Sequence, residues 1–200
     1  MSTEDKTEQM RKVKDDVVDL TESPLYEYRQ ENGYLPVIGE GNHDADIMFI
    51  GEAPGKTEAE TGRPFCGAAG NLLNKLLSHI DLDRDSVYIT NVLKDRPPDN
   101  RDPKQKEIDV YVPFLRRQIR IIEPDVIATL GRFGMEFVED EFGIDCGGTI
   151  SQVHGDVFTI EEDDKEITFI PLFHPAVGLY DGSQRDTLKE DFVVLQDHVS

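Results

Sequence analysis

Three polar side chains stand at the ends of short apolar runs in this sequence, and an aromatic side chain lies between two of them. Glu52, Asn91 and His174 are the three polar residues, and Phe65 is the aromatic one. An aromatic face can stack on a planar ring, and an amide can pair with the ring's polar edge. An imidazole N–H can stabilise negative charge that develops on the ring. These residue types favour a site that binds a planar, hydrogen-bonding ring.

The stretch IMFIGEAPGKTEAETGRPFCGAAG, residues 47–70, holds two of these residues. An apolar run, a glycine-containing turn and a helix-like segment follow one another in it, which is how open α/β sheets build sites at the carboxyl ends of their strands. A tight turn without any ligand is the alternative for a lone glycine-rich loop. Because the loop also carries Glu58, Glu60, Arg63 and Phe65, we favour a site.

Strands and helices alternate along the chain, which predicts a mostly parallel sheet covered by helices on both faces. The expected strands span residues 46–52, 87–92, 126–130, 153–160 and 166–173, the last two flanking an acidic turn at Glu161–Lys165. The expected helices span residues 66–80, 103–122, with Pro103 at the first helical position, 132–141 and 184–198. The carboxyl ends of parallel strands meet at one edge, so Glu52, Asn91 and His174 should converge there.

The 200 residues fit one domain, which we place at residues 21–200 behind a charged N-terminal helix or tail at residues 1–20. Thr21–Asp44 is expected to be loop-like, since it carries Pro24, Pro36 and several glycines. No apolar run could span a bilayer, and no signal peptide is evident. The two cysteines, Cys66 and Cys146, predict neither a disulfide framework nor a cysteine-ligated metal. We expect a monomeric cytoplasmic protein with no membrane partner.

The formal net charge is −20, which at first argues against a nucleic-acid partner. The charge is unevenly spread, because residues 56–132 hold 13 Lys and Arg against 12 Asp and Glu. Acidic residues are therefore concentrated toward both ends of the chain. Such a surface is typical of adaptation to high salt, where phosphate contacts contribute little to affinity in any case. The acidic composition does not exclude DNA.

Three motifs occur in a fixed order: GEAPGKTEAETGRPFCGAAG at residues 51–70, YITNVLKDRPPDNRDP at 88–103 and FHPA at 173–176. In this order they resemble the uracil-DNA glycosylase superfamily and, within it, family 4. The resemblance runs from about Leu20 to the C-terminal helix. It implies a three-layer α/β/α sandwich around a four-stranded parallel sheet, and an enzyme that hydrolyses the N-glycosidic bond of uracil in DNA to leave an abasic site.

The resemblance also implies the roles of single residues in the base pocket. Phe65 would stack on the flipped uracil, Asn91 would pair with its polar edge, and His174 would donate to uracil O2 as the bond breaks. The alternatives are a core phenylalanine, an asparagine that caps a turn and a structural histidine. Gly51 and Ala53 would complete the uracil pocket.

Two carboxylates would complete the catalytic set. Glu52 lies in the family's catalytic loop, and Glu58 matches a carboxylate that lines the pocket near uracil C5, although a solvated acid is the alternative for Glu58. In some superfamily members an Asp in this loop positions water, and here Ala53 takes its place. Catalysis would then depend on stabilising the leaving uracil anion through His174, with Glu52 or Glu58 acting through water.

DNA contacts are expected around this pocket. Leu179 matches the wedge that the family inserts into the duplex, and Tyr180 stands where an Arg is common; it could serve by stacking on a base. The expected DNA-binding residues are Lys94, Arg96, Arg101, Leu179, Tyr180 and Arg185.

One departure from family 4 concerns its [4Fe–4S] cluster, which four cysteine thiolates bind. The matching positions here hold Leu20, Ser23, Asp95 and Tyr111, so we expect no cluster and no other cofactor. Packing of Leu20 against Tyr111 is expected to hold the N-terminal segment instead. The loss places the rigidity of the loop around Asp95, and thus the grip on DNA, in question.

The leading hypothesis is a metal-independent enzyme that excises uracil from single- or double-stranded DNA. One alternative is a glycosylase with a broader range of deaminated bases. The other is a catalytically silent relative that binds DNA or a nucleotide. Retention of Glu52, Phe65, Asn91 and His174 argues against the silent relative, because a binding protein has no need of a proton donor.

Overall fold

The computed structural model describes residues 2–162 and 165–198, and its strands form a six-stranded sheet in the order β1-β3-β2-β4-β6-β5. Strands β3, β2, β4 and β6 are parallel neighbours, whereas β1 and β5 pair antiparallel at the two edges. The strands are β1 (Glu40–Gly41), β2 (Ile47–Gly51), β3 (Tyr88–Asn91), β4 (Val126–Leu130), β5 (Phe158–Glu162) and β6 (Lys165–Leu172). The predicted four-stranded parallel sheet is confirmed as the centre, and two antiparallel edge strands extend it.

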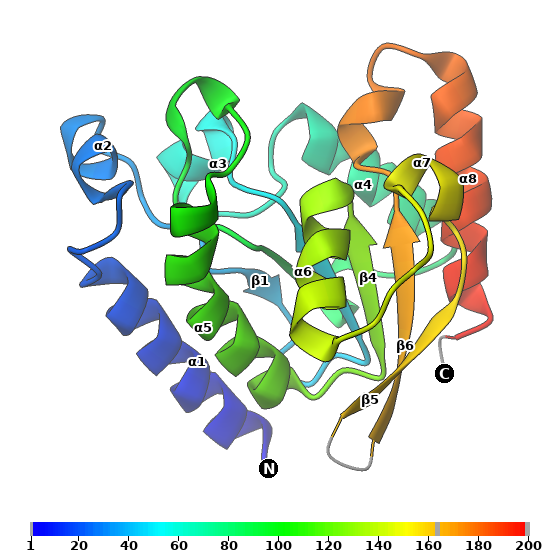
Figure 1. Ribbon diagram of the computed structural model, residues 1–200, viewed down its shortest axis with the longest axis horizontal. Helices are drawn as coiled ribbons and strands as arrows, with labels where there is room; N and C mark the ends of the chain where they lie inside the picture. Colours follow the sequence, from blue (N-terminus) through cyan, green and yellow to red (C-terminus); the bar gives the residue numbers. More distant parts are fainter. Residues whose placement is uncertain (1, 163–164, 199–200) are drawn as a thin grey trace.

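Helices cover both faces of this sheet, as the alternating pattern predicted (Figure 1). Helices α1, α5 and α6 pack on one face, and α4 and α8 pack on the other. The helices are α1 (Thr3–Val18), α2 (Tyr26–Glu31), α3 (Lys56–Thr61), α4 (Ala68–His79), α5 (Gln105–Ile122), α6 (Arg132–Phe142), α7 (Ile150–Val153) and α8 (Gly182–Gln196). Short 3-10 turns are η1 (Arg84–Ser86), η2 (Pro98–Asn100) and η3 (Pro175–Gly178).

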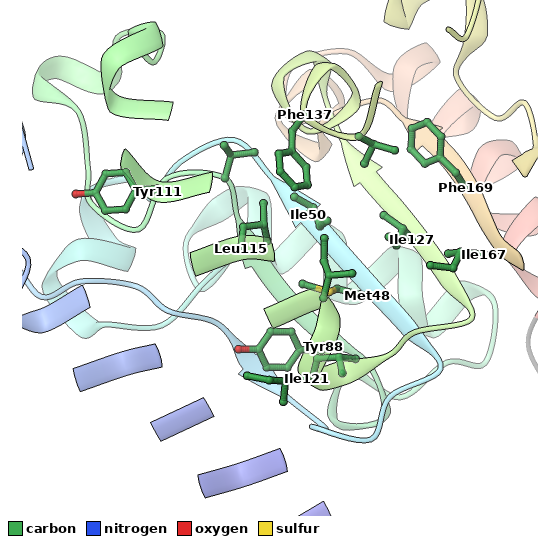
Figure 2. Packing of buried hydrophobic residues seen from close by; sticks show 14 of the residues in the cluster. Met48, Ile50, Tyr88, Tyr111, Leu115, Ile121, Ile127, Phe137, Ile167 and Phe169 are labelled. Atoms are coloured by element: carbon green, nitrogen blue, oxygen red, sulfur yellow. The ribbon is translucent and has the colours of Figure 1, made fainter. Parts of the chain in front are cut away.

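The two cores follow from the alternation of side chains along the strands. Met48 and Ile50 of β2 point toward α5, where Leu115 lies in the same buried cluster (Figure 2). Phe49 points to the other face, where its ring stacks on Phe192 of α8 with centroids 6.0 Å apart. Central strands buried on both faces form a rigid platform for side chains at their carboxyl ends.

Several predicted boundaries differ from the structure. The expected loop at residues 21–44 contains α2 and β1, and α3 lies within the expected polar loop after β2. Both helices are only six residues long, too short to show an apolar period. Residues 150–153 form α7, so the strand expected from Val153 begins at Phe158. Pro103 precedes the N-cap residue Lys104 of α5 and is not the first helical residue.

The acidic turn expected at Glu161–Lys165 falls partly outside the described residues, because Asp163 and Asp164 are not among them. The flanking strands β5 and β6 pair antiparallel from Phe158 opposite Phe169 to Glu162 opposite Lys165. Within the described residues, no helix has the length and apolar character needed to cross a bilayer.

Helix α1 is packed onto the domain along its length. Met10, Val13 and Val17 are buried in the same cluster as α5. Lys6 extends this contact, since its Nζ lies 2.8 Å from Asp44 Oδ1 and donates to the Ile122 carbonyl at 2.9 Å.

Candidate active site

A cavity of about 380 Å³ lies at the carboxyl edge of the sheet. The arrowheads of β4 and β6 point to this edge, where α3, the loop before α5 and the turn after β6 gather (Figure 1). The pocket brings together predicted site residues from four segments: Glu52, Ala53, Glu58, Phe65, Asn91, Arg101 and His174. The sequence reasoning missed six further lining residues: Pro54, Gly55, Ala69, Pro97, Asn100 and Ala176.

Gly51 lies directly behind the pocket wall rather than on it. A Cβ at this position would lie 2.4 Å from Asn91 Oδ1 and 2.6 Å from Phe65 Cζ. Both distances are shorter than any real contact, so a side chain at Gly51 would displace the amide and the ring together. Glycine here allows the strand end to approach the two side chains that line the pocket.

Phe65 is held in an unusual backbone conformation. Its φ is +45°, which is rare outside glycine. Arg84 fixes this turn by donating to the carbonyls of Phe65 at 3.1 Å and Pro64 at 2.7 Å. Gly70 leaves the necessary space, because a Cβ there would lie 1.8 Å from the Phe65 oxygen. Strain maintained by surrounding contacts is common at binding sites, and here it orients the ring.

Asn91 is the last residue of β3 and is almost fully buried. Its side-chain oxygen Oδ1 is buried and has no hydrogen-bond partner among the described residues. A buried polar atom without a partner costs about 1–3 kcal/mol of stability. An N–H donor on a bound ligand would remove that cost, so the amide is arranged to recognise a ring that carries such a donor.

His174 follows β6 and lies beside Phe65, with ring centroids 5.6 Å apart. The Ala176 backbone N–H donates to His174 Nδ1 at 3.1 Å, so a neutral imidazole carries its proton on Nε2. Burial lowers the pKa of His174 to about 4, with Glu58 opposing the shift. At neutral pH the residue is therefore an uncharged N–H donor with a fixed tautomer.

Glu52 follows β2 and lines the same pocket. Burial raises its pKa from 4.5 to about 7; the negative charge of Asp102 adds to the shift, and Arg132 opposes it. A carboxyl group that titrates near neutral pH can accept a proton from water at little cost, which is the property of a general base.

Glu58 supports the loop as well as lining the pocket. Its Oε1 accepts the backbone N–H groups of Cys66 at 3.0 Å and Gly67 at 2.8 Å. Gly67 is the N-cap of α4, so the carboxylate sits at the positive end of that helix. Glu58 therefore fastens the turn that carries Phe65.

The family model described as the uracil DNA glycosylase superfamily matches residues 38–194 of this chain. The chain belongs to this superfamily. It is 43% identical over 184 residues, 92% of the chain and 81% of the relative, to a type-4 uracil-DNA glycosylase of Sulfurisphaera tokodaii. It is 44% identical over 165 residues, 82% of the chain and 81% of the relative, to a type-4 uracil-DNA glycosylase of Archaeoglobus fulgidus. The family predicted from the motifs is thus confirmed.

The side chain of Lys94 does not reach the surface. Its expected contact with DNA is therefore contradicted. Its side chain is fully buried, and Nζ donates to Thr90 Oγ1 at 2.7 Å, the Asn91 carbonyl at 2.7 Å and Gln118 Oε1 at 2.5 Å. All three donors of the ammonium group have oxygen partners within the core. Lys94 therefore ties the strand end that bears Asn91 to α5.

Arg101 lines the pocket and Arg96 lies in the same loop, but both form hydrogen bonds with other residues of the chain. Arg96 donates to the hydroxyl of Tyr28 at 3.1 Å, that of Tyr34 at 3.2 Å and Asn100 Oδ1 at 2.9 Å. The sequence reasoning missed the two tyrosines, since both lie in the segment expected to be a loop. Arg101 pairs with Glu107 through two hydrogen bonds of 2.6 and 2.9 Å.

The turn after His174 leads to Leu179 and Tyr180, the residues predicted to form a wedge. Tyr180 is 96% exposed, and Leu179 precedes it as the C-cap residue of η3. Arg185 donates to the carbonyls of Gly178 at 2.5 Å and Leu179 at 3.0 Å. Arg185 thus fixes the turn that carries Leu179 and Tyr180, and its expected contact with DNA stays a prediction.

The four positions that match the family's cluster cysteines do not fit an iron–sulfur cluster. Ser23, Asp95 and Tyr111 offer only oxygen atoms, and these are hydrogen-bonded to one another. Leu20 offers no ligand and packs at the edge of the apolar cluster. Among the described residues, no group of three or more His, Cys, Asp or Glu could hold a metal ion. A polar network joins the other three positions, and the expected packing of Leu20 against Tyr111 stays a prediction.

Proposed function

We propose that this chain is a DNA repair enzyme that hydrolyses the N-glycosidic bond of uracil in DNA. The observation that carries the proposal is the buried Oδ1 of Asn91, which has no hydrogen-bond partner among the residues that the structure describes, in a pocket that also holds Phe65 and a neutral His174. Uracil presents an N–H beside two carbonyl oxygens on a flat ring, which these groups complement. The names of the type-4 relatives support the same reaction.

The reaction divides among four side chains. Phe65 stacks on the extruded base, Asn91 Oδ1 accepts the N–H of uracil, and His174 Nε2–H donates to O2. As the bond between deoxyribose C1′ and uracil N1 breaks, its electron pair moves onto uracil, where the His174 donor stabilises the anion. Water then adds to C1′, and the Glu52 carboxylate takes its proton. The products are an abasic site and the uracil anion, which becomes neutral uracil by taking a proton at N1 from solvent.

The DNA strand would cross the pocket mouth between two flanking surfaces. The loop before α5 carries Arg96 and Arg101, and the segment between β6 and α8 carries the proposed wedge residues Leu179 and Tyr180, which Arg185 supports (Figure 1). Extruding a base leaves a gap in the stack, and an aromatic contact such as Tyr180 contributes about 1–3 kcal/mol to binding a neighbouring base. We propose that the chain acts as a monomer on single- or double-stranded DNA. Its single glycosylase domain would span residues 21–200, and α1 precedes this domain.

The purified protein is expected to release uracil from a uracil-containing oligonucleotide and to leave an alkali-labile site at that position. The assay is run at low and at molar salt, because the net charge of −20 repels DNA most strongly at low salt. Oligonucleotides with hypoxanthine or xanthine in place of uracil test the broader base range. Absence of cleavage in every salt would contradict the proposal and favour a silent DNA-binding relative.

We further propose that the protein works without a [4Fe–4S] cluster. The purified protein is expected to be colourless, to contain no stoichiometric iron or acid-labile sulfide, and to keep its activity in chelators. The reason is that oxygen ligands paired with one another cannot replace a cage of four thiolates. Iron near four atoms per chain would contradict this.

A further inference from the structure

Four buried polar side chains form one network beneath the loop that follows β3. Ser23, Arg29, Asp95 and Tyr111 are each at most 5% exposed. They come from three parts of the chain, namely the segment between α1 and β1, the loop after β3, and α5. Tyr111 directs its hydroxyl away from Leu115 and the rest of the apolar cluster (Figure 2).

The hydrogen bonds of this network have a defined direction. Tyr111 Oη donates to Asp95 Oδ2 at 2.5 Å, because burial and the nearby Asp95 carboxylate raise the pKa of Tyr111 and keep its proton in place. The contact of 2.6 Å between Ser23 Oγ and Tyr111 Oη must then be donated by Ser23. Ser23 Oγ in turn accepts the Leu25 backbone N–H at 3.1 Å. Each hydroxyl therefore donates one hydrogen bond and accepts another.

Arg29 completes the network from the other side. Its Nη1 lies 3.3 and 3.2 Å from the two Asp95 oxygens. The same guanidinium donates to the carbonyls of Val17 at 3.2 Å and Val18 at 2.8 Å, the last two residues of α1. A cation at this end of a helix also interacts favourably with the helix dipole. Asp95 thus links the end of α1, the following segment and α5.

The loop that Asp95 anchors forms the outer wall of the pocket. Pro97, Asn100 and Arg101 of this loop line the cavity. Arg96, next to Asp95, reaches back to the segment through the hydroxyls of Tyr28 and Tyr34. The loop and the segment are therefore joined twice, once through the buried Asp95 and once through the more exposed Arg96.

We infer that Ser23, Arg29, Asp95 and Tyr111 are positioning residues that take the place of the family's iron–sulfur cluster as the anchor of the loop at residues 94–101, whose Arg96, Asn100 and Arg101 would contact DNA. None of the four touches the base pocket, so they act through Arg96, Asn100 and Arg101. The inference rests on the proposed function, because it assumes that this loop contacts DNA. It assigns a role to the residues at three of the four former ligand positions.

Tyr111→Phe is the decisive variant, because it removes one hydroxyl and leaves the packed ring. Amide hydrogen exchange in residues 94–101 is expected to accelerate by about tenfold or more, the effect of losing a buried hydrogen bond to a charged group. Affinity for a fluorescent single-stranded oligonucleotide without uracil is expected to weaken. The single-turnover rate at saturating enzyme should stay within about threefold of the parent rate, because Phe65, Asn91 and His174, which act on the base, lie outside this loop.

Asp191→Asn is the control. Asp191 is also buried, and its Oδ2 lies 2.9 Å from His154 Nδ1, but it belongs to α8, which covers the face of the sheet opposite α5. Equal loop exchange in the two variants, unchanged exchange in Tyr111→Phe, or faster exchange with unchanged DNA affinity would each overturn the inference. Because exchange and binding need no excision, a parent protein without glycosylase activity would refute the proposed function and leave this test decisive.

Discussion

Replacing His174 with alanine is expected to slow single-turnover excision of uracil by roughly 10²–10³-fold, the usual cost of one oxyanion-type donor. The side chain is fixed before the substrate arrives, since the Ala176 N–H occupies Nδ1 and leaves Nε2–H as the donor. Its hydrogen bond to uracil O2 strengthens only as negative charge develops. The loss should therefore appear in the chemical step rather than in binding.

Two further measurements separate this role from a structural one. Affinity for uracil-containing DNA should change little in His174→Ala, because stacking on Phe65 and the backbone contacts remain. The factor by which His174→Ala slows excision should also vary little above pH 5. The pKa of His174 is about 4, so its imidazole is already neutral there. His79→Ala is the matched control, because His79 is exposed at the end of α4. Equal rates for His174→Ala and the parent would place the donor elsewhere.

The base pocket could be predicted from the sequence, because its residues stand at strand ends within ordered motifs. Glu52, Phe65, Asn91 and His174 all line one cavity, as the convergence of parallel strands required. The direction of a side chain in an irregular loop could not be predicted in the same way. Lys94 stands only three residues after Asn91 and yet points into the core, because three oxygens there satisfy its ammonium group.

The hydrogen-bond network of Ser23, Arg29, Asp95 and Tyr111 could not be predicted from the sequence either. Ser23 and Tyr111 are 88 residues apart, and Asp95 lies between them in sequence with no periodicity that links the three. Such a network depends on three segments meeting, and local pattern carries no information about that. From the sequence, the missing cysteine ligands placed the rigidity of the loop around Asp95 in question. In the structure the Asp95 carboxylate accepts hydrogen bonds from Tyr111 and Arg29.

The second large effect concerns Glu52. The single-turnover rate of the parent protein is expected to rise with pH through about 7. The reason is that the Glu52 carboxyl group must lose its proton before it can accept one from water. Glu52→Gln should abolish this rise and lower the rate above pH 8 by roughly 10²–10⁴-fold, the usual range for a general base. The measurement is a series of single-turnover rates from pH 5 to 9 for the parent and the variant.

Glu52→Gln should be more stable than the parent protein at the alkaline pH where it is less active. The pKa of Glu52 is raised in the folded state from 4.5 to about 7, so the folded protein binds the proton more tightly than the unfolded chain does. Its contribution is favourable below pH 4.5 and is lost as the pH rises through 7. Glu52→Gln removes that loss, so the variant should be as stable as the parent at pH 5 and more stable at pH 8.

Denaturant unfolding at these two pH values measures the difference in the free energy of unfolding. Glu136→Gln is the matched control, since Glu136 lies within electrostatic reach of Glu52 but does not line the pocket. A variant that is both inactive and less stable at pH 8 would mean that the Glu52 carboxylate holds the loop rather than water. A pH profile that persists in Glu52→Gln would assign the ionisation near 7 to another group and remove Glu52 as the base.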